Sequence, residues 1–360
     1  MSSFQIRIMQ FYDSLKKPET IGNIISLYSG CGGLDIGFNL AGFNPVWAND
    51  IDKYATQTYQ EFFPNHTVTT GNLLNQQLPK ISDVDLVIGG PPCQGFSVAG
   101  KMDPNDPRSK HVWNFMGVVD KISPRGFVME NVKSLAVNSR WQELMKSLIK
   151  EANKMGYHTK LLTLNASHFG VPQARERMFL IGLKERKIIE PFAFSKANPV
   201  MLKSAFIGLP NYGQKGNDSI CTAKITTAKN PILRKSPFAG MLFNGQGRPM
   251  NLDMPAMTLP ASMGGNRTPI VDQIQIDNPT AKSWLIDYHE HLLKGGSPHN
   301  EVPTSLRRIT VEEAAAIQTF PRDMKFYGTQ TTRYRQIGNA VPPGLAYHVG
   351  LAVRQAIHGF

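Results

Sequence analysis

The sequence predicts an α/β fold with a mostly parallel sheet covered by helices, joined to a smaller, loop-rich domain. Short apolar runs alternate with amphipathic segments through the first half of the chain, a pattern typical of βαβ units. The alternation ends at about residue 184, and through about residue 304 the chain is rich in Gly, Pro, Asn and Met with little periodicity. Strand–helix alternation places helices on both faces of a parallel sheet, whereas the irregular segment predicts a separate compact region.

The elements of the larger domain follow from this periodicity in chain order. The first expected strand, residues 24–28, leads through a Gly-rich turn into a helix that continues to about residue 41. Regularity returns after the irregular segment at residues 310–313 (TVEE), a capping-box pattern that begins a short helix. The other expected strands are residues 43–48, 85–88, 126–129, 158–164 and 178–183, and the other expected helices are residues 53–62, 112–122, 141–155 and 344–357.

Length, composition and cysteine count restrict the class of protein. A chain of 360 residues can bury a large core, and 41% hydrophobic with 18% charged residues is typical of globular proteins rather than disordered or membrane-spanning ones. We find no long apolar run and no secretory leader in residues 1–26, and we expect no membrane association. Cys31, Cys93 and Cys221 are too few and too scattered for a disulfide framework or a zinc cluster, so we expect a reducing compartment and no metal.

The charge balance favours a polyanionic partner. There are 39 Lys and Arg residues against 27 Asp and Glu residues, a net charge of +12. Each phosphate that a basic surface neutralises releases condensed counterions, which favours binding to nucleic acid. Many basic proteins bind no polyanion, so charge alone indicates such a partner only weakly.

The most informative segment is residues 91–97 (PPCQGFS). It follows an apolar run, residues 85–90, that is typical of a buried strand opening into a loop. Two prolines stiffen the approach to Cys93, and nearby glycines let a substrate come close to the backbone. The pattern favours a nucleophile at a strand end; the alternative is a small buried hydrophobe, which most free cysteines are.

A second segment, residues 29–33 (SGCGG), lies between the first strand and the first helix, where glycines let a ligand approach the helix N-terminus. Asp35 occupies the third glycine position of the dinucleotide fingerprint, so that motif is incomplete. Asp50 ends the second strand, where an acidic side chain typically holds ribose hydroxyls. Together these residues predict an adenosine-containing cofactor that carries either a hydride or a methyl group; the alternative is a simple tight turn.

Further reacting groups are expected at the same edge of the sheet. Glu130 follows the expected strand 126–129 and is placed for acid–base chemistry, unless it merely caps the next helix. Arg175 and Arg177 are two residues apart and face one side of a strand, where they either hold a phosphate or base edge, pair with Glu130, or form a solvated basic edge. A thiol and a carboxylic acid on neighbouring strand ends suit attack on a heterocycle.

Taken together, six segments in one order resemble the DNA (cytosine-5) methyltransferase family. The resemblance covers residues 24–184 and 306–360, and it implies a Rossmann-like S-adenosylmethionine-dependent methyltransferase fold with a smaller, loop-rich target-recognition domain. Any one short motif arises by chance, whereas six in this order are specific. The six are residues 29–33 (SGCGG), 90–97 (GPPCQGFS), 130–132 (ENV), 173–177 (QARER), 307–321 and 336–342 (QIGNAVP).

The resemblance implies S-adenosyl-L-methionine as cofactor and S-adenosyl-L-homocysteine as product. It implies that Cys93 attacks C6 of a cytosine flipped out of the duplex, that Glu130 engages N3 and the exocyclic amine, and that Arg175 and Arg177 hold the base and the attacking loop. Asp50 is implied to hold the ribose. The remaining residues implied to line the cofactor pocket are Tyr28, Gly30, Cys31, Gly32, Gly33, Ile51, Asn72, Leu73, Pro91, Asn339, Ala340 and Val341.

Two positions depart from the family pattern. Ile51 stands where an aromatic residue often packs on adenine, and Asn72 stands where many members carry an aspartate. An asparagine still accepts a hydrogen bond, so we expect cofactor binding to be retained.

The resemblance also implies a domain order and a DNA partner. Residues 1–23 are an N-terminal extension, 24–184 the catalytic and cofactor-binding domain, 185–305 the target-recognition domain, and 306–360 a segment that returns to the catalytic domain. Double-stranded DNA is the implied substrate, but the target sequence does not follow from the residues. The residues expected to contact DNA are Gln94, Ser97, Thr258, Leu259, Arg248, Asn266 and Arg267, although a polar residue there is more often simply exposed.

Three alternatives remain open at this point: the same chemistry on transfer RNA, a catalytically inactive DNA-binding regulator, and a nicotinamide-dependent oxidoreductase. The long irregular segment favours sequence recognition on DNA. A short chain without added regulatory domains resembles a monomeric, cytoplasmic prokaryotic enzyme that protects host DNA from a partner restriction endonuclease. An orphan enzyme without such a partner has the same sequence features.

Overall fold

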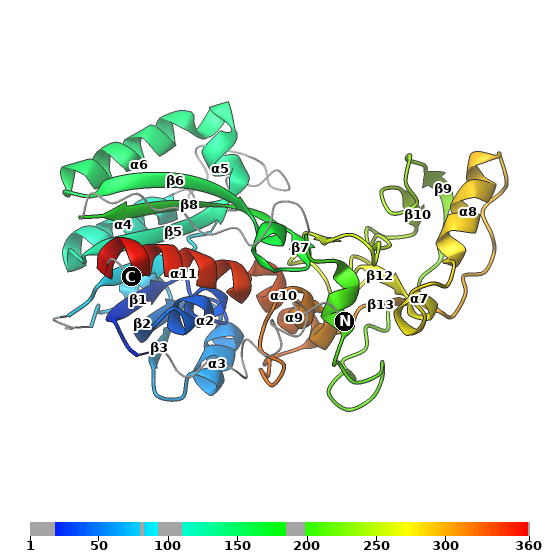
Figure 1. Ribbon diagram of the computed structural model, residues 1–360, viewed down its shortest axis with the longest axis horizontal. Helices are drawn as coiled ribbons and strands as arrows, with labels where there is room; N and C mark the ends of the chain where they lie inside the picture. The colour runs from blue at the N-terminus through cyan, green and yellow to red at the C-terminus, as the bar shows by residue number, and fades with distance from the viewer. Residues whose placement is uncertain (1–18, 80–82, 93–109, 185–198, 359–360) are drawn as a thin grey trace. The chain divides into compact units, whose positions relative to one another are not determined.

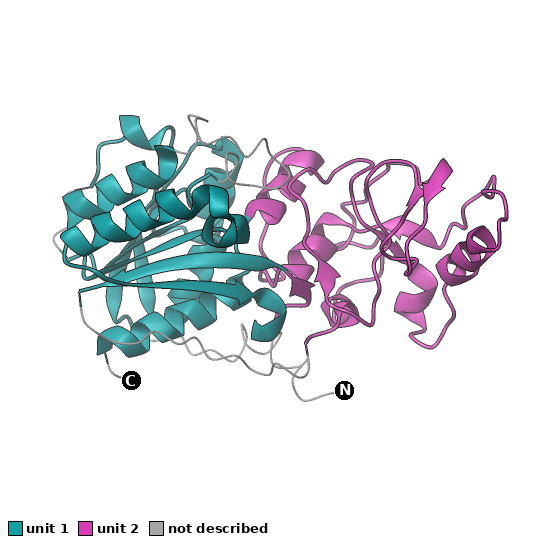
Figure 2. Ribbon diagram, turned by 90° about the horizontal axis from the view of Figure 1, so that it is seen from above, with its two compact units in different colours: residues 1–170, 175–196, 340–360 teal, residues 171–174, 197–339 magenta. Residues whose placement is uncertain are grey.

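The computed structural model describes residues 19–79, 83–92, 110–184 and 199–358 (Figure 1). Cys93, Gln94 and Ser97 therefore lie outside the described residues. The chain divides into two compact units, which Figure 2 shows in different colours. Unit 1 comprises Met1–Gly170, Arg175–Lys196 and Ala340–Phe360, and unit 2 comprises Val171–Ala174 and Ala197–Asn339.

Unit 1 is built on a seven-stranded sheet of order β3-β2-β1-β4-β5-β8-β6. Neighbouring strands are parallel except that β8 runs antiparallel to both β5 and β6, which confirms the predicted mostly parallel sheet. Every residue of β4 is buried, as expected for a strand that is covered on both faces. The strands are β1 (Gly22–Leu27), β2 (Phe43–Asp50), β3 (Thr67–Thr70), β4 (Leu86–Gly89), β5 (Gly126–Val132), β6 (His158–Asn165) and β8 (Glu176–Leu183).

Helices cover both faces of this sheet. On one face, α4 and α6 pack against a core that includes Ile25 and Leu27 of β1. Ser26 alternates with those residues and donates a hydrogen bond to Asp35 of α2, so α2 lies on the opposite face. The helices of unit 1 are α2 (Gly33–Leu40), α3 (Lys53–Phe62), α4 (His111–Ile122), α5 (Lys133–Val137), α6 (Gln142–Lys154) and α11 (Pro343–His358), with short 3₁₀ turns η1 (Leu73–Asn75), η3 (Ser139–Trp141) and η4 (Ala166–Phe169).

The last helix, α11, packs on the first one. A Cβ atom added to Gly37 of α2 would lie 2.4 Å from Cβ of Ala346, so only glycine permits this close approach. Figure 1 shows α11 in red beside the blue α2. The part of the chain that contains α11 therefore belongs to the same compact unit as the sheet.

Unit 2 consists of short strand pairs and helices joined by long loops. It has its own apolar core, in which Leu242 and Phe243 pack with Leu285 and Tyr288 of α8. The elements are η5 (Leu202–Phe206), the antiparallel pair β9 (Thr227–Ile232) and β10 (Met241–Phe243), the parallel pair β7 (Gln173–Ala174) and β11 (Ala256–Met257), the antiparallel pair β12 (Ile270–Asp272) and β13 (Leu306–Arg308), and helices α7 (Gln273–Asp277), α8 (Trp284–Leu293), α9 (Val311–Ile317) and α10 (Gln330–Asn339).

Several expected boundaries need correction. β1 begins at Gly22, so the end of the expected N-terminal extension belongs to the sheet. β5 continues to Val132 because its pairing with β8 continues to that residue, and Glu130 therefore lies within the strand rather than after it. Helices α8 and α10 were not expected. The division into compact units assigns residues 306–339 to unit 2, and only the chain from Ala340 onward to unit 1.

Candidate active site

The turn after β1 is shaped by three residues in the left-handed region of backbone conformation. Tyr28 and Gly30 both have φ of 54°, and Gly32 has φ of 89°. A Cβ atom on Gly32 would also lie 3.0 Å from the ring of Tyr59, so glycine is needed there for both conformation and space. The turn directs its backbone toward the N-terminus of α2, where an anionic or polar ligand group is favoured.

Asp50 lies at the end of β2 beside this turn. Its Oδ2 accepts a hydrogen bond from Gly30 N at 2.8 Å, and its Oδ1 accepts one from Asp52 N at 2.8 Å. Burial raises the pKa of Asp50, while those backbone N–H groups act to lower it. The carboxylate is therefore fixed by backbone donors at the position where the sequence predicts a ribose contact.

A second carboxylate, Asp35, is fully buried beneath the turn. It accepts hydrogen bonds from Ser26 Oγ at 2.9 Å and from Tyr59 Oη at 3.0 Å. Burial raises the pKa of Asp35 to about 6, against the effect of those hydrogen bonds. The residue that breaks the dinucleotide fingerprint thus ties α2 to β1 and α3.

The two departures from the family pattern lie close together. Gly71 N donates to Asp50 O at 2.9 Å, which brings the segment containing Asn72 beside Ile51. The side chain of Ile51 is 72% exposed, and Asn72 caps η1 by accepting a hydrogen bond from Leu74 N at 3.1 Å. Since its oxygen is already engaged, Asn72 has its amide N–H groups left to offer a ligand. Leu73 is buried and Leu74 is 65% exposed.

Glu130 and the two arginines of the sequence motif come together where β5 ends and β8 begins. Arg177 Nε lies 2.9 Å from Glu130 Oε1, and Arg175 is almost completely buried. Burial raises the pKa of Glu130, and the positive charges of Arg177 and then Arg175 counteract this. The interpretation of Glu130 as a helix cap is wrong, because Val132 is the N-cap residue of α5.

The other oxygen of Glu130 faces the segment that leads to Cys93. A Cβ atom on Gly90 would lie 2.8 Å from Glu130 Oε2, so only a glycine leaves room for the carboxyl. Next to it, Asn131 Nδ2 donates to Pro91 O at 3.1 Å. These contacts bring the ends of β4 and β5 together, as expected for neighbouring parallel strands. The 130–132 motif did not predict this role of Asn131.

The predicted C-terminal contributors lie where the two units meet in sequence. Asn339 is the exposed last residue of α10, Ala340 is half-buried, and Val341 is buried. In unit 2, a Cβ atom on Gly338 would lie 2.7 Å from Ala261 Cα, so this turn is closely packed.

Thr258 and Leu259 lie beside β7 in unit 2. Thr258 Oγ1 donates to Ala174 O at 3.0 Å, and Leu259 N donates to Gln173 Oε1 at 3.2 Å. Leu259 is buried, whereas Thr258 is exposed. The fully buried Gln173 thus organises the segment just before Arg175, a role that the sequence analysis did not assign.

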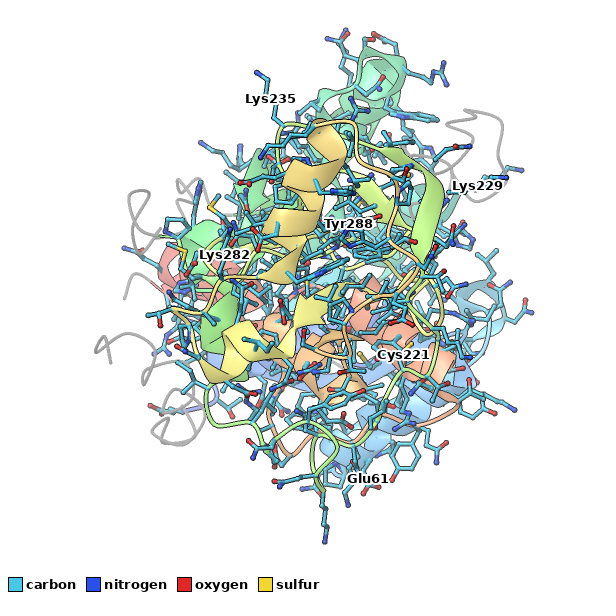
Figure 3. The ribbon with its side chains drawn as sticks, turned by 90° about the vertical axis from the view of Figure 1, so that its right-hand side faces the viewer. Glu61, Cys221, Lys229, Lys235, Lys282 and Tyr288 are labelled. Atoms are coloured by element: carbon cyan, nitrogen blue, oxygen red, sulfur yellow. The ribbon has the colours of Figure 1, made fainter. Side chains whose placement is uncertain are left out.

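The other expected DNA contacts are exposed side chains on two adjacent loops. Arg248, Asn266 and Arg267 are all exposed, and Gly247 N donates to Asn266 O at 2.8 Å. Arg308 secures one of these loops by donating to the carbonyls of Asn266 and Thr268. Lys229 and Lys235 of the β9 region are exposed as well (Figure 3), and no sequence motif predicted a role for them.

No metal site or membrane span is found in the part of the chain that the structure describes. Within it, no three His, Cys, Asp or Glu side chains cluster in a way that suits a metal ion. None of its helices has the length and apolar character required to cross a bilayer.

The whole chain can be compared with known families. The C-5 cytosine-specific DNA methylase family matches residues 22–355. The chain belongs to this family. It is a DNA cytosine-5 methyltransferase, which contradicts the alternative of a nicotinamide-dependent oxidoreductase.

Individual relatives agree with this assignment. The type II methyltransferase M.FnuDI of Fusobacterium nucleatum is 33% identical over 350 residues, which cover 93% of this chain and 94% of the relative. The type II methyltransferase M1.HphI of Haemophilus parahaemolyticus is 31% identical, with coverage of 91% and 86%. A solved structure of a mutant Spodoptera frugiperda DNMT2 has the same fold, with a TM-score of 0.67, 19% identity and coverage of 94% and 100%.

Proposed function

We propose that this methyltransferase acts through a covalent bond between Cys93 Sγ and C6 of a cytosine that has been flipped out of duplex DNA. One observation supports this most directly: Glu130 is buried, is paired through one oxygen with Arg177, and turns its other oxygen to Gly90, three residues before Cys93. The carboxyl that should engage the base thus lies beside the strand end that carries the nucleophile.

The chemistry requires both groups. C5 of cytosine is a poor nucleophile, and it becomes enamine-like when a thiolate adds to C6 while N3 gains a proton. The raised pKa of Glu130 favours the protonated carboxyl, which can donate to N3. After C5 accepts the methyl group, loss of the C5 proton expels the thiolate and restores the aromatic ring. Contacts in the pocket offset the stacking free energy that the flipped base loses.

The residues of unit 1 fit S-adenosyl-L-methionine, which supplies an electrophilic methyl group when bound. Asp50, held by two backbone donors, suits the ribose hydroxyls. The exposed side chain of Ile51 offers an apolar surface for adenine, and the amide of Asn72 offers donors to ring nitrogens. The turn at Gly30 and Gly32 allows close approach at the N-terminus of α2.

The covalent step is tested with a duplex that contains 5-fluorocytosine in the recognition sequence, together with the methyl donor. We expect a stable adduct with the wild type and none with Cys93→Ala, which should also lose methyl transfer while binding the duplex. Cys221→Ala is the matched control, since Cys221 is a buried cysteine of unit 2 and its loss should leave adduct formation intact. An adduct with Cys93→Ala, or methylation at a near-normal rate, would show that another mechanism operates.

We also propose that unit 2 recognises the target sequence and that the enzyme works with a restriction endonuclease. The exposed Arg248, Asn266 and Arg267 lie on two connected loops, suited to contacts with bases or phosphates. The relatives named type II methyltransferases support the endonuclease pairing. We propose that the enzyme is monomeric and acts in the cytoplasm of a prokaryote. Bisulfite sequencing of DNA from an expressing host should show 5-methylcytosine in one sequence context; scattered or absent methylation would contradict this.

A further inference from the structure

Tyr28 combines an unfavourable backbone conformation with a specific side-chain anchor. Its φ of 54° is one of three positive values among non-glycine residues in the described ranges. Glycine, asparagine and aspartate adopt this region readily, whereas a tyrosine adopts it only when its surroundings hold it there. The side chain therefore has to supply the restraint.

That restraint comes from the first turn of α4. Tyr28 Oη lies 3.1 Å from His111 Nδ1, and the two rings meet edge to face with centroids 5.5 Å apart. Asn114, one helical turn further along α4, acts to lower the pKa of Tyr28. Burial raises the pKa of Tyr28 to about 12 and lowers the pKa of His111, which favours a neutral imidazole as acceptor for the phenol.

Tyr28 is the first residue of the 28–33 turn, whose backbone faces the proposed cofactor site. Ser29 N donates to Asn49 O at 3.0 Å, and Gly30 N donates to Asp50 Oδ2 at 2.8 Å. Because Tyr28 immediately precedes these donors, its conformation determines the direction in which they point. Replacing His111 should therefore alter the backbone hydrogen bonds to Asp50 through Tyr28, although His111 belongs to α4.

We propose that His111 is a positioning residue for the cofactor: through Tyr28 Oη it holds the 28–33 turn in its binding conformation and so sets the affinity for S-adenosyl-L-methionine. This inference rests on the proposed cofactor site. It gives His111 a role in binding and none in the bond-forming steps.

The test is a double-mutant cycle read by equilibrium binding of S-adenosyl-L-homocysteine. We expect Tyr28→Phe and His111→Leu each to raise Kd by about five- to tenfold, the effect of one hydrogen bond. The double variant should be no worse than Tyr28→Phe alone, because that change already removes the bond to His111. His111→Asn places an acceptor near the position of Nδ1 and should restore most of the affinity. Lys121→Gln, at the exposed end of α4, is the matched control and should leave Kd unchanged.

Methyl-transfer kinetics separate positioning from chemistry. In each variant KM for the cofactor should rise as Kd does, while kcat at saturating cofactor stays within about twofold of wild type. Unchanged affinity in both single variants, additive losses in the double variant, or a fall in kcat at constant Kd would each overturn the role of His111. A wild-type protein that binds no S-adenosyl-L-homocysteine would instead overturn the proposed cofactor site.

Discussion

Each unit of the molecule contains a buried glutamate–arginine pair, and the two pairs are built differently. In unit 2, Arg307 holds both oxygens of Glu313, at 2.8 and 2.7 Å. Glu313 also accepts hydrogen bonds from Thr310 N and from Asn217 Nδ2, and the guanidinium of Arg307 stacks on the Tyr212 ring with 4.1 Å to its centroid. Every polar atom of this carboxylate is therefore committed to the fold.

In unit 1, Arg177 approaches a single oxygen of Glu130. Glu130 Oε2 makes no hydrogen bond within the described residues and faces Gly90. In the proposed mechanism this oxygen engages the base, and burial raises the pKa of Glu130, which favours its protonated form. The two carboxylates thus differ in hydrogen-bond saturation, and in the proposed mechanism it is the unsaturated one, Glu130, that engages the base.

The largest effect should come from the Glu130–Arg177 pair, in which one carboxylate oxygen has no hydrogen bond within the described residues. We expect Glu130→Gln to slow methyl transfer in a single turnover by about two to four orders of magnitude, since an amide cannot donate a proton to N3. The free energy of unfolding, measured by urea titration, should fall by less than in Glu313→Gln, because Arg177 contacts only one oxygen of Glu130 and glutamine keeps an amide oxygen as acceptor. An unaffected single-turnover rate would remove Glu130 from the mechanism.

The Arg307–Glu313 pair should show the opposite pattern, a loss of stability without a loss of the methyl-transfer rate. We expect Glu313→Gln to lower the free energy of unfolding by about 3–5 kcal/mol, because it leaves the buried Arg307 charge without compensation. The single-turnover rate of the folded fraction should remain close to wild type. A stable variant that has lost methyl transfer would reverse the assignments of the two pairs.

A third buried carboxylate, Asp35, extends the comparison because it has hydroxyl donors and no cation partner within the described residues. Its folded pKa of about 6 lies above the ordinary value of 3.8, so between these pH values the folded state holds a proton that the unfolded state has lost. The contribution of Asp35 to stability is therefore most favourable below about pH 4 and declines, by at most about 3 kcal/mol, as pH rises to about 6.

This pH dependence should disappear in Asp35→Asn. Urea titrations at pH 4.5, 5.5 and 7 give the free energy of unfolding of both proteins. As pH rises, the wild type should lose stability relative to the variant. The comparison of the two proteins cancels the titration of other groups. A difference that is constant over this range would place the folded pKa of Asp35 near its ordinary value.

The smallest effect should come from an exposed glutamate–lysine ion pair. Glu143 and Lys146 lie 2.8 Å apart at the start of α6, with side chains 83% and 62% exposed. We expect Glu143→Gln to change the free energy of unfolding by less than about 0.5 kcal/mol, because water and salt screen the interaction. A loss of unfolding free energy as large as that of Glu313→Gln would mean that burial does not explain why the Arg307–Glu313 pair stabilises the fold more than the Glu143–Lys146 pair.

The sequence alone determined the local features of this protein. Helix α3 occupies the predicted residues because Asp52 caps its N-terminus, and Thr310 forms the predicted capping box with Glu313. The strand–helix order, the glycine turn and the acid at the end of β2 were equally predictable, because periodicity, caps and glycine requirements involve neighbouring residues. The family resemblance added the catalytic motif residues.

Only the tertiary structure decided which distant groups meet. Glu130 pairs with Arg177, 47 positions along the chain, because β8 lies antiparallel beside β5, and that pairing also lengthens β5 beyond its apolar run. His111 meets Tyr28, 83 positions away, because α4 packs on the sheet near the end of β1. Such contacts depend on strand order and packing, which act between segments far apart in sequence and leave no periodic signal within either segment.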